Sequence, residues 1–132
     1  RLVGLEFHPL TMMYDEAGRS ASPYGGGAYV LSPAGVGDYV AASGEALAPS
    51  GFEAGVEGFA NAHPSHEFSW GVADIVNAVL GAGLALEALR EYPYANGCKI
   101  WPTLAERPDR RYVVPDGQHA PPLMLGWSAR KT

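Results

Sequence analysis

Cysteine and long hydrophobic runs are both scarce in this 132-residue sequence. Cys98 is the only cysteine, so no disulfide can form within the chain, and this usage is typical of proteins in a reducing compartment. No apolar run approaches the roughly 18 residues that a membrane-spanning helix needs, and no stretch resembles a signal peptide. The sequence therefore predicts a cytoplasmic location and no membrane partner.

Positive charge is also sparse. The chain has 9 Lys and Arg against 14 Asp and Glu, which gives a formal net charge of −5. Binding to phosphates requires clustered Lys and Arg, so we expect no nucleic-acid partner. Apolar residues make up 47% of the chain, and its length is sufficient for one domain with a core. We therefore treat residues 1–132 as a single domain, or as part of one.

Glycine and proline are abundant, with 17 and 11 residues. Much of this excess lies in residues 10–66, for which we predict a loop-rich insertion that acts as a lid or binding loop. Short apolar runs at 29–31 and 39–42 are compatible with either a strand or a helical turn, because no periodicity lasts long enough to distinguish them.

The sequence LVGLEF at 2–7 predicts a strand with apolar residues on both faces. Pro9 keeps His8 out of helical space, so the strand should end at the His-Pro pair. A strand of this kind needs neighbours, and an unpaired one would be an adhesive edge.

Residues 68–94 contain the clearest periodicity. Five apolar residues follow the spacing of one helix face: Val72, Ile75, Val76, Val79 and Leu80. We expect Ser69 to cap this helix, Asp74 to interact favourably with its dipole, and Gly83 to end it in the left-handed conformation.

The next segment, LALEALREY at 84–92, is ambiguous. Its residues are strong helix formers, yet Leu84, Leu86 and Ala88 also alternate as in a strand. Residues 122–132 predict a terminal strand, because Leu123, Leu125 and Trp127 share one face.

Together, the His-Pro strand end, ADIVNAVLGAGLALEALREYPY and the closing PPLMLGWSARK resemble the C-terminal half of class I S-adenosylmethionine-dependent methyltransferases of the small-molecule type. The resemblance covers both ends of the chain and residues 68–94. It implies an α/β fold: a partial Rossmann-like sheet with one main helix and a long loop-rich insertion. Segments 2–7, 122–132 and 84–92 would be its fifth, seventh and sixth strands, side by side in that order, with the last strand antiparallel between the others. We prefer a strand at 84–92 for this reason.

The resemblance also implies S-adenosylmethionine as cofactor, but only together with an N-terminal half. The usual cofactor cradle is a Gly-rich turn after the first strand and an acidic residue after the second. The glycines at 25–27 and 81–83 do not follow a strand in this way, so we assign no cofactor-binding residue. The chain is then the substrate-side portion of a methyltransferase, unable to bind S-adenosylmethionine or to transfer methyl by itself.

The alternative function is a non-catalytic module, either homo-oligomeric or partner-binding, derived from that fold. In either case we expect strand 2–7 to pair with the N-terminal half or with a second copy of the chain. The other expected partner is a small-molecule substrate.

Five residues are candidates for the substrate pocket: His8, Met12, Tyr24, His66 and Trp70. His8 is the candidate catalytic residue, because it ends a strand and can orient or deprotonate a substrate; alternatively, it caps the strand end through a backbone hydrogen bond. The family pattern has Trp, a spacer and His before the helix, where this chain has Phe68 and Trp70. Because this chain has no His at that position, the resemblance assigns no acid/base role there.

A metal site is not expected. His63, His66 and Glu67 lie close together in the sequence, but Pro64 argues against the helix that would bring them onto one face. A metal-binding α+β domain is the third alternative. Cys98 follows a turn and is expected to be inert.

Overall fold

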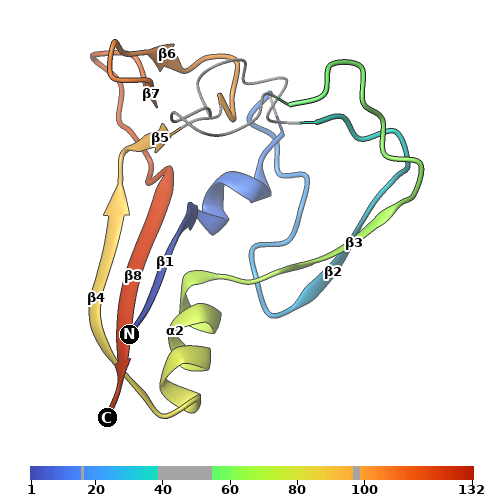
Figure 1. Cartoon of the computed structure of the whole chain (residues 1–132). Coiled ribbons are helices and arrows are strands. Elements are labelled where there is room, and N and C mark those ends of the chain that lie inside the picture. The colour runs from blue at the N-terminus through green and yellow to red at the C-terminus, as the bar shows by residue number, and fades with distance from the viewer. Residues whose placement is uncertain (16, 39–54, 97–98) are drawn as a thin grey trace.

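The computed structural model describes residues 1–15, 17–38, 55–96 and 99–132 (Figure 1). In chain order the elements are β1 (Leu2–Phe7), the 3₁₀ helix η1 (Pro9–Met13), β2 (Ala28–Ser32), β3 (Ser65–Ser69), α2 (Val72–Gly81), β4 (Leu84–Tyr92), β5 (Tyr94–Asn96), β6 (Ala105–Glu106), β7 (Arg111–Val113) and β8 (Met124–Lys131). These strands pair as three sheets: β1-β8-β4, β2-β3 and β5-β7-β6.

The sheet β1-β8-β4, here called the main sheet, contains the three predicted strand segments. β8 lies in the middle and is antiparallel to both neighbours, with Trp127 opposite Gly4 on one side and Leu89 on the other. This is the order expected for these segments. The strand at Leu2–Phe7 is confirmed, and so is a strand rather than a second helix at Leu84–Tyr92. The terminal strand begins at Met124, two residues later than predicted.

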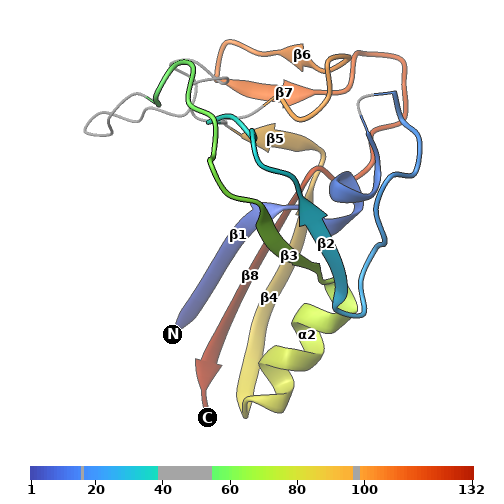
Figure 2. The same ribbon diagram turned by 90° about the vertical axis from the view of Figure 1, so that its right-hand side faces the viewer.

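The predicted fold class, an α/β Rossmann-like sheet, is wrong. Every ladder among the described residues is antiparallel, whereas a Rossmann-like fold is built on a parallel sheet with helices on both faces. β1 and β4 run in the same direction but do not pair, because β8 lies between them. Within the described ranges α2 is the only α-helix, and it lies along one face of the main sheet beside β4 (Figure 2).

Helix α2 begins later than the sequence suggested. Its N-cap is Gly71, and Ser69 belongs to β3, so the predicted Ser69 cap is wrong. The Asp74 carboxylate instead accepts a hydrogen bond of 2.8 Å from the Gly71 N–H. At the other end Gly83 has φ +72°, the left-handed conformation that was predicted.

Two pairings were not anticipated. The insertion at 10–66 contributes most of η1 and all of β2. Strand β2 pairs antiparallel with β3, and Tyr29 lies opposite Phe68. Residues 29–31 lie in β2, while 39–42 fall outside the described residues. The segment between β4 and β8 contains the sheet β5-β7-β6, and the buried core there is Ala95, Leu104, Tyr112 and Leu123.

Candidate functional site

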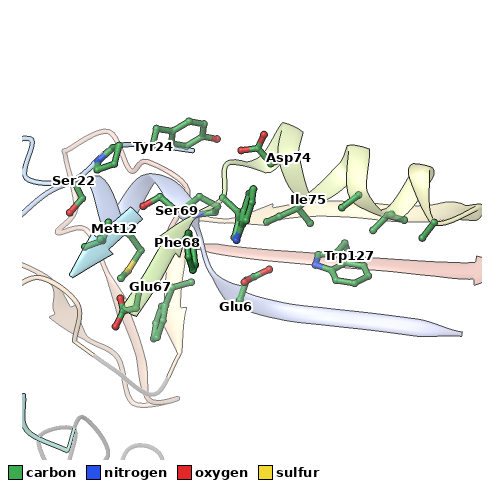
Figure 3. A pocket seen from close by; sticks show the side chains of 18 of the residues that line it. Glu6, Met12, Ser22, Tyr24, Glu67, Phe68, Ser69, Asp74, Ile75 and Trp127 are labelled. Atoms are coloured by element: carbon green, nitrogen blue, oxygen red, sulfur yellow. The ribbon is translucent and has the colours of Figure 1, made fainter. Parts of the chain in front are cut away.

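A cavity of about 670 Å³ lies between the main sheet, α2 and the β2-β3 ladder (Figure 3). The main sheet contributes Leu2, Glu6, Phe7, Leu84 and Trp127. Helix α2 contributes Asp74, Ile75, Ala78, Val79 and Ala82. The remaining wall includes Met12, Tyr24, Val30, Glu67, Phe68 and Trp70. The volume is in the range of small-molecule binding sites, which are mostly apolar with a few polar groups.

The floor of the cavity depends on a glycine in β1. The Trp127 indole lies over Gly4, and an ideal Cβ built on Gly4 would be 2.3 Å from its Cε2 atom. Glycine at this position therefore gives the indole room to lie flat on the strand. The Trp127 Nε1 is buried and has no hydrogen-bond partner among the described residues, so the indole is held here by packing.

The loop before β2, which forms one rim of the cavity, is hydrogen-bonded to the start of α2. Asp74 Oδ2 accepts hydrogen bonds from the Gly26 N–H at 2.7 Å and from the Gly71 N–H at 2.8 Å. These two bonds, with the one from Gly26 the larger cause, lower the pKa of Asp74 from its ordinary value of 3.8. The Tyr24 hydroxyl accepts a bond of 3.3 Å from the Val72 N–H. The loop before β2 is thus attached to the helix by groups on both sides.

Trp70 is positioned by the same loop. Gly27 has φ +70°, and a Cβ there would be 2.7 Å from the Trp70 ring, so the turn can approach the indole only because residue 27 is glycine. The Trp70 side chain nevertheless remains 54% exposed. Its ring is therefore fixed on one side and available on the other.

His8, the candidate catalytic residue, is only 3% exposed and does not line the cavity. Its Nδ1 accepts a hydrogen bond of 3.1 Å from the Leu10 N–H, so Nε2 carries the ring proton and donates to Glu91 Oε1 at 2.9 Å. Both ring nitrogens therefore have partners that hold η1 to β1 and β4. The alternative role, capping of the strand end, matches these contacts, and a catalytic role of His8 stays a prediction.

The other predicted pocket residues divide into two groups. Met12, Tyr24 and Trp70 line the cavity. His66 does not; its Nδ1 is 2.6 Å from the Tyr29 hydroxyl and its ring stacks on that of Tyr29. The structure therefore brings three of the five candidates together.

Sequence reasoning missed Glu6, Trp127 and the α2 residues as cavity walls. Trp127 and Ile75 were identified as members of apolar faces, and such a pattern normally indicates core. Whether a face is covered or left open depends on where the β2-β3 ladder lies, and no local signal gives that position.

Within the described ranges, no group of three or more His, Cys, Asp or Glu residues could hold a metal ion. His63, His66 and Glu67 lie within these ranges, whereas Cys98 lies outside them. In the part of the chain that the structure covers, no helix has the length and apolar content needed to cross a bilayer.

Comparison with protein-family models, with curated proteins and with solved structures gave no match to this chain.

Proposed function

We propose that this chain is the substrate-side portion of an S-adenosylmethionine-dependent methyltransferase, with a small-molecule methyl acceptor bound in the cavity beneath α2. The single observation that carries the proposal is that cavity, about 670 Å³ in volume with largely apolar and aromatic walls. Methyl transfer depends mainly on in-line positioning in a site from which water is excluded. Such a site needs shape and dry walls more than an acid/base pair.

The methyl donor belongs to a separate segment that pairs with β1. Support comes from the outer edge of β1, which has no strand partner among the described residues, and from Val3 and Leu5, which are 68% and 62% exposed. By itself the 132-residue chain then neither binds S-adenosylmethionine nor transfers methyl. Titration calorimetry with S-adenosylmethionine tests this statement, and a stoichiometric heat with micromolar affinity would contradict it.

The acceptor role is tested with the complete gene product that contains these residues. It is incubated with S-adenosylmethionine and a panel of small amines, phenols and carboxylates, and S-adenosylhomocysteine is measured. We expect acceptor-dependent product, and we expect Ala78→Phe, which fills the cavity from α2, to lower kcat/KM by about tenfold or more.

Ala73→Phe is the matched control, because Ala73 lies on the same helix, is exposed and does not line the cavity. It should keep wild-type activity. If no acceptor gives S-adenosylhomocysteine, or if Ala78→Phe is as active as Ala73→Phe, the proposal is wrong.

The second candidate is a non-catalytic homo-oligomeric or partner-binding module. The observation that favours it is again the open edge of β1 with its exposed Leu2, Val3 and Leu5, since such an edge is a template for pairing with another chain. Size-exclusion chromatography with light scattering tests it. A mass of twice 13.9 kDa supports self-association, and a monodisperse monomer counts against it.

A further inference from the structure

The charged side chains that line the cavity all have the same sign. They are Glu6 from β1, Glu67 from β3 and Asp74 from α2, and no Lys, Arg or His lines the cavity with them. Five aromatic residues complete the walls: Phe7, Tyr24, Phe68, Trp70 and Trp127. Carboxylates and aromatic rings therefore surround one mainly apolar space.

The three carboxylates differ in what compensates their charge. Asp74 accepts two backbone hydrogen bonds, and Glu67 accepts one of 3.0 Å from the Ser65 hydroxyl. The Glu6 carboxylate has neither a hydrogen bond nor an ion pair with the described residues. In Figure 3 its carboxylate points into the space beneath α2, on the side where Trp127 lies. Glu6 is therefore the carboxylate left for a ligand.

These groups favour one ligand class. A cation near the face of Trp, Tyr or Phe is attracted by the ring quadrupole, and Trp is the strongest partner. Glu6 and Glu67 are exposed, so each carboxylate adds a modest, solvent-screened attraction to that of the rings. An anionic ligand would instead meet three carboxylates and no cationic side chain.

We infer that the cavity is selective for an organic cation, with a tertiary amine as methyl acceptor and its quaternary ammonium product, and with Glu6 as counter-ion between aromatic walls. This inference deepens the proposed function and rests on it for the methyl-transfer step. In that step the acceptor reacts as the free base, after its ammonium proton has left to solvent, and its lone pair forms the new N–C bond while the C–S bond of the sulfonium breaks. The sulfur becomes a neutral thioether, the nitrogen becomes a quaternary ammonium, and the single positive charge is conserved without a further proton transfer.

A pair of isosteric probes tests the charge preference directly. Choline and 3,3-dimethylbutan-1-ol have the same shape and differ in the charge of the central atom, and their binding to the 132-residue chain is followed by NMR titration of its backbone amides. We expect choline to bind about tenfold more tightly than the alcohol. Glu6→Gln should weaken choline binding by about threefold to tenfold and leave the alcohol unchanged.

Glu106→Gln is the matched control, because Glu106 is an exposed strand residue that does not line the cavity; it should bind both probes as wild type does. A third titration uses S-adenosylmethionine. If the sulfonium binds in a Glu6-dependent way and choline does not, the ammonium assignment is overturned. Equal affinity for the two isosteres, no binding of either, or no effect of Glu6→Gln also overturns the inference.

The binding experiment and the methyl-transfer experiment test different statements, so one can give a negative result while the other gives a positive one. If neutral acceptors yield S-adenosylhomocysteine and Glu6→Gln is fully active, the charge preference is wrong and the proposed function stands. If choline binds as expected but no acceptor gives S-adenosylhomocysteine, the cation site stands and the proposed function is wrong.

Discussion

At the scale of single residues, Asp74 has the most consequential contacts, because one carboxylate oxygen joins the loop at Gly26 to the helix start at Gly71. These bonds favour the ionised form and lower its pKa below 3.8. A lowered pKa in the folded state contributes stability that is present above the unfolded value and is lost as the pH falls through the folded one. Protonation of Asp74 at low pH should therefore lower the free energy of unfolding.

We expect Asp74→Asn to reduce the dependence of the thermal unfolding midpoint on pH below 3.8, and to lower that midpoint at neutral pH. Circular dichroism melts between pH 2 and about 7 measure both effects. Some acid dependence should remain in the variant, because the backbone and side-chain bonds from Arg19 also lower the pKa of Asp15. Identical pH profiles for wild type and variant would show that the Asp74 bonds do not affect stability.

A second prediction concerns Gly4, which lies directly beneath the Trp127 indole. A Cβ at Gly4 would be 2.3 Å from that ring, so Gly4→Ala must displace the indole, and we expect a loss of about 1–3 kcal/mol in unfolding free energy. Gly81→Ala is the control, since a Cβ there has nothing within 4 Å and alanine favours the helix by about 1 kcal/mol. Urea denaturation compares the two, and equal effects of the two substitutions would contradict the packing argument.

Residue roles were predictable from the sequence where they depend on near neighbours. Gly83 was identified because the rule for helix ends spans only a few positions. Asp74 was placed correctly near the helix start, but its bond from Gly26 depends on a distant loop. The same limit applies to His8, whose partner Glu91 is 83 residues away.

At the scale of elements, β4 shows tertiary pairing overriding local propensity. The sequence LALEALREY contains strong helix formers, yet it forms a nine-residue strand that pairs with β8, with a register shift between Leu86 and Ala88. The residue pattern alone left helix and strand open. The β2-β3 ladder could not be predicted at all, because five-residue strands far apart in the sequence carry no information on which partner they meet.

The β2-β3 ladder should also be the weakest part of the described structure. It has two strands, and Tyr29, Leu31 and Phe68 are each more than half exposed, whereas β8 pairs on both sides and contains the buried Leu125 and Ala129. Two-stranded ladders are marginally stable, and local opening follows low burial. We therefore expect amides of β2 and β3 to exchange with deuterium at least about tenfold faster than those of β8, measured by hydrogen exchange with mass spectrometry. Equal protection would mean that the ladder and main sheet open together.

At the scale of the whole molecule, the sequence predicted the three strands of the main sheet but not the fold class. The apolar run at 2–7 and the shared apolar face at 122–132 indicate strands, and the family resemblance favoured a strand at 84–92. The residue patterns do not say whether neighbours run parallel or antiparallel. The separate core around Ala95 and Tyr112 formed from a segment too rich in proline and arginine to suggest strands. The cavity exists because the main sheet, α2 and the β2-β3 ladder border a space without filling it, so it followed from no single segment.

The open edge of β1 gives the last prediction. If two copies pair antiparallel across a two-fold axis at Gly4, Val3 of one chain lies opposite Leu5 of the other, and these exposed apolar residues form cross-strand contacts. A lysine on an edge strand opposes such pairing. We therefore expect the wild-type chain to dimerise and Val3→Lys to be monomeric in size-exclusion chromatography with light scattering. Leu31→Lys removes a similarly exposed apolar residue from β2 and should remain dimeric. A monomeric wild type, or equal masses for the two variants, would rule out self-association through β1.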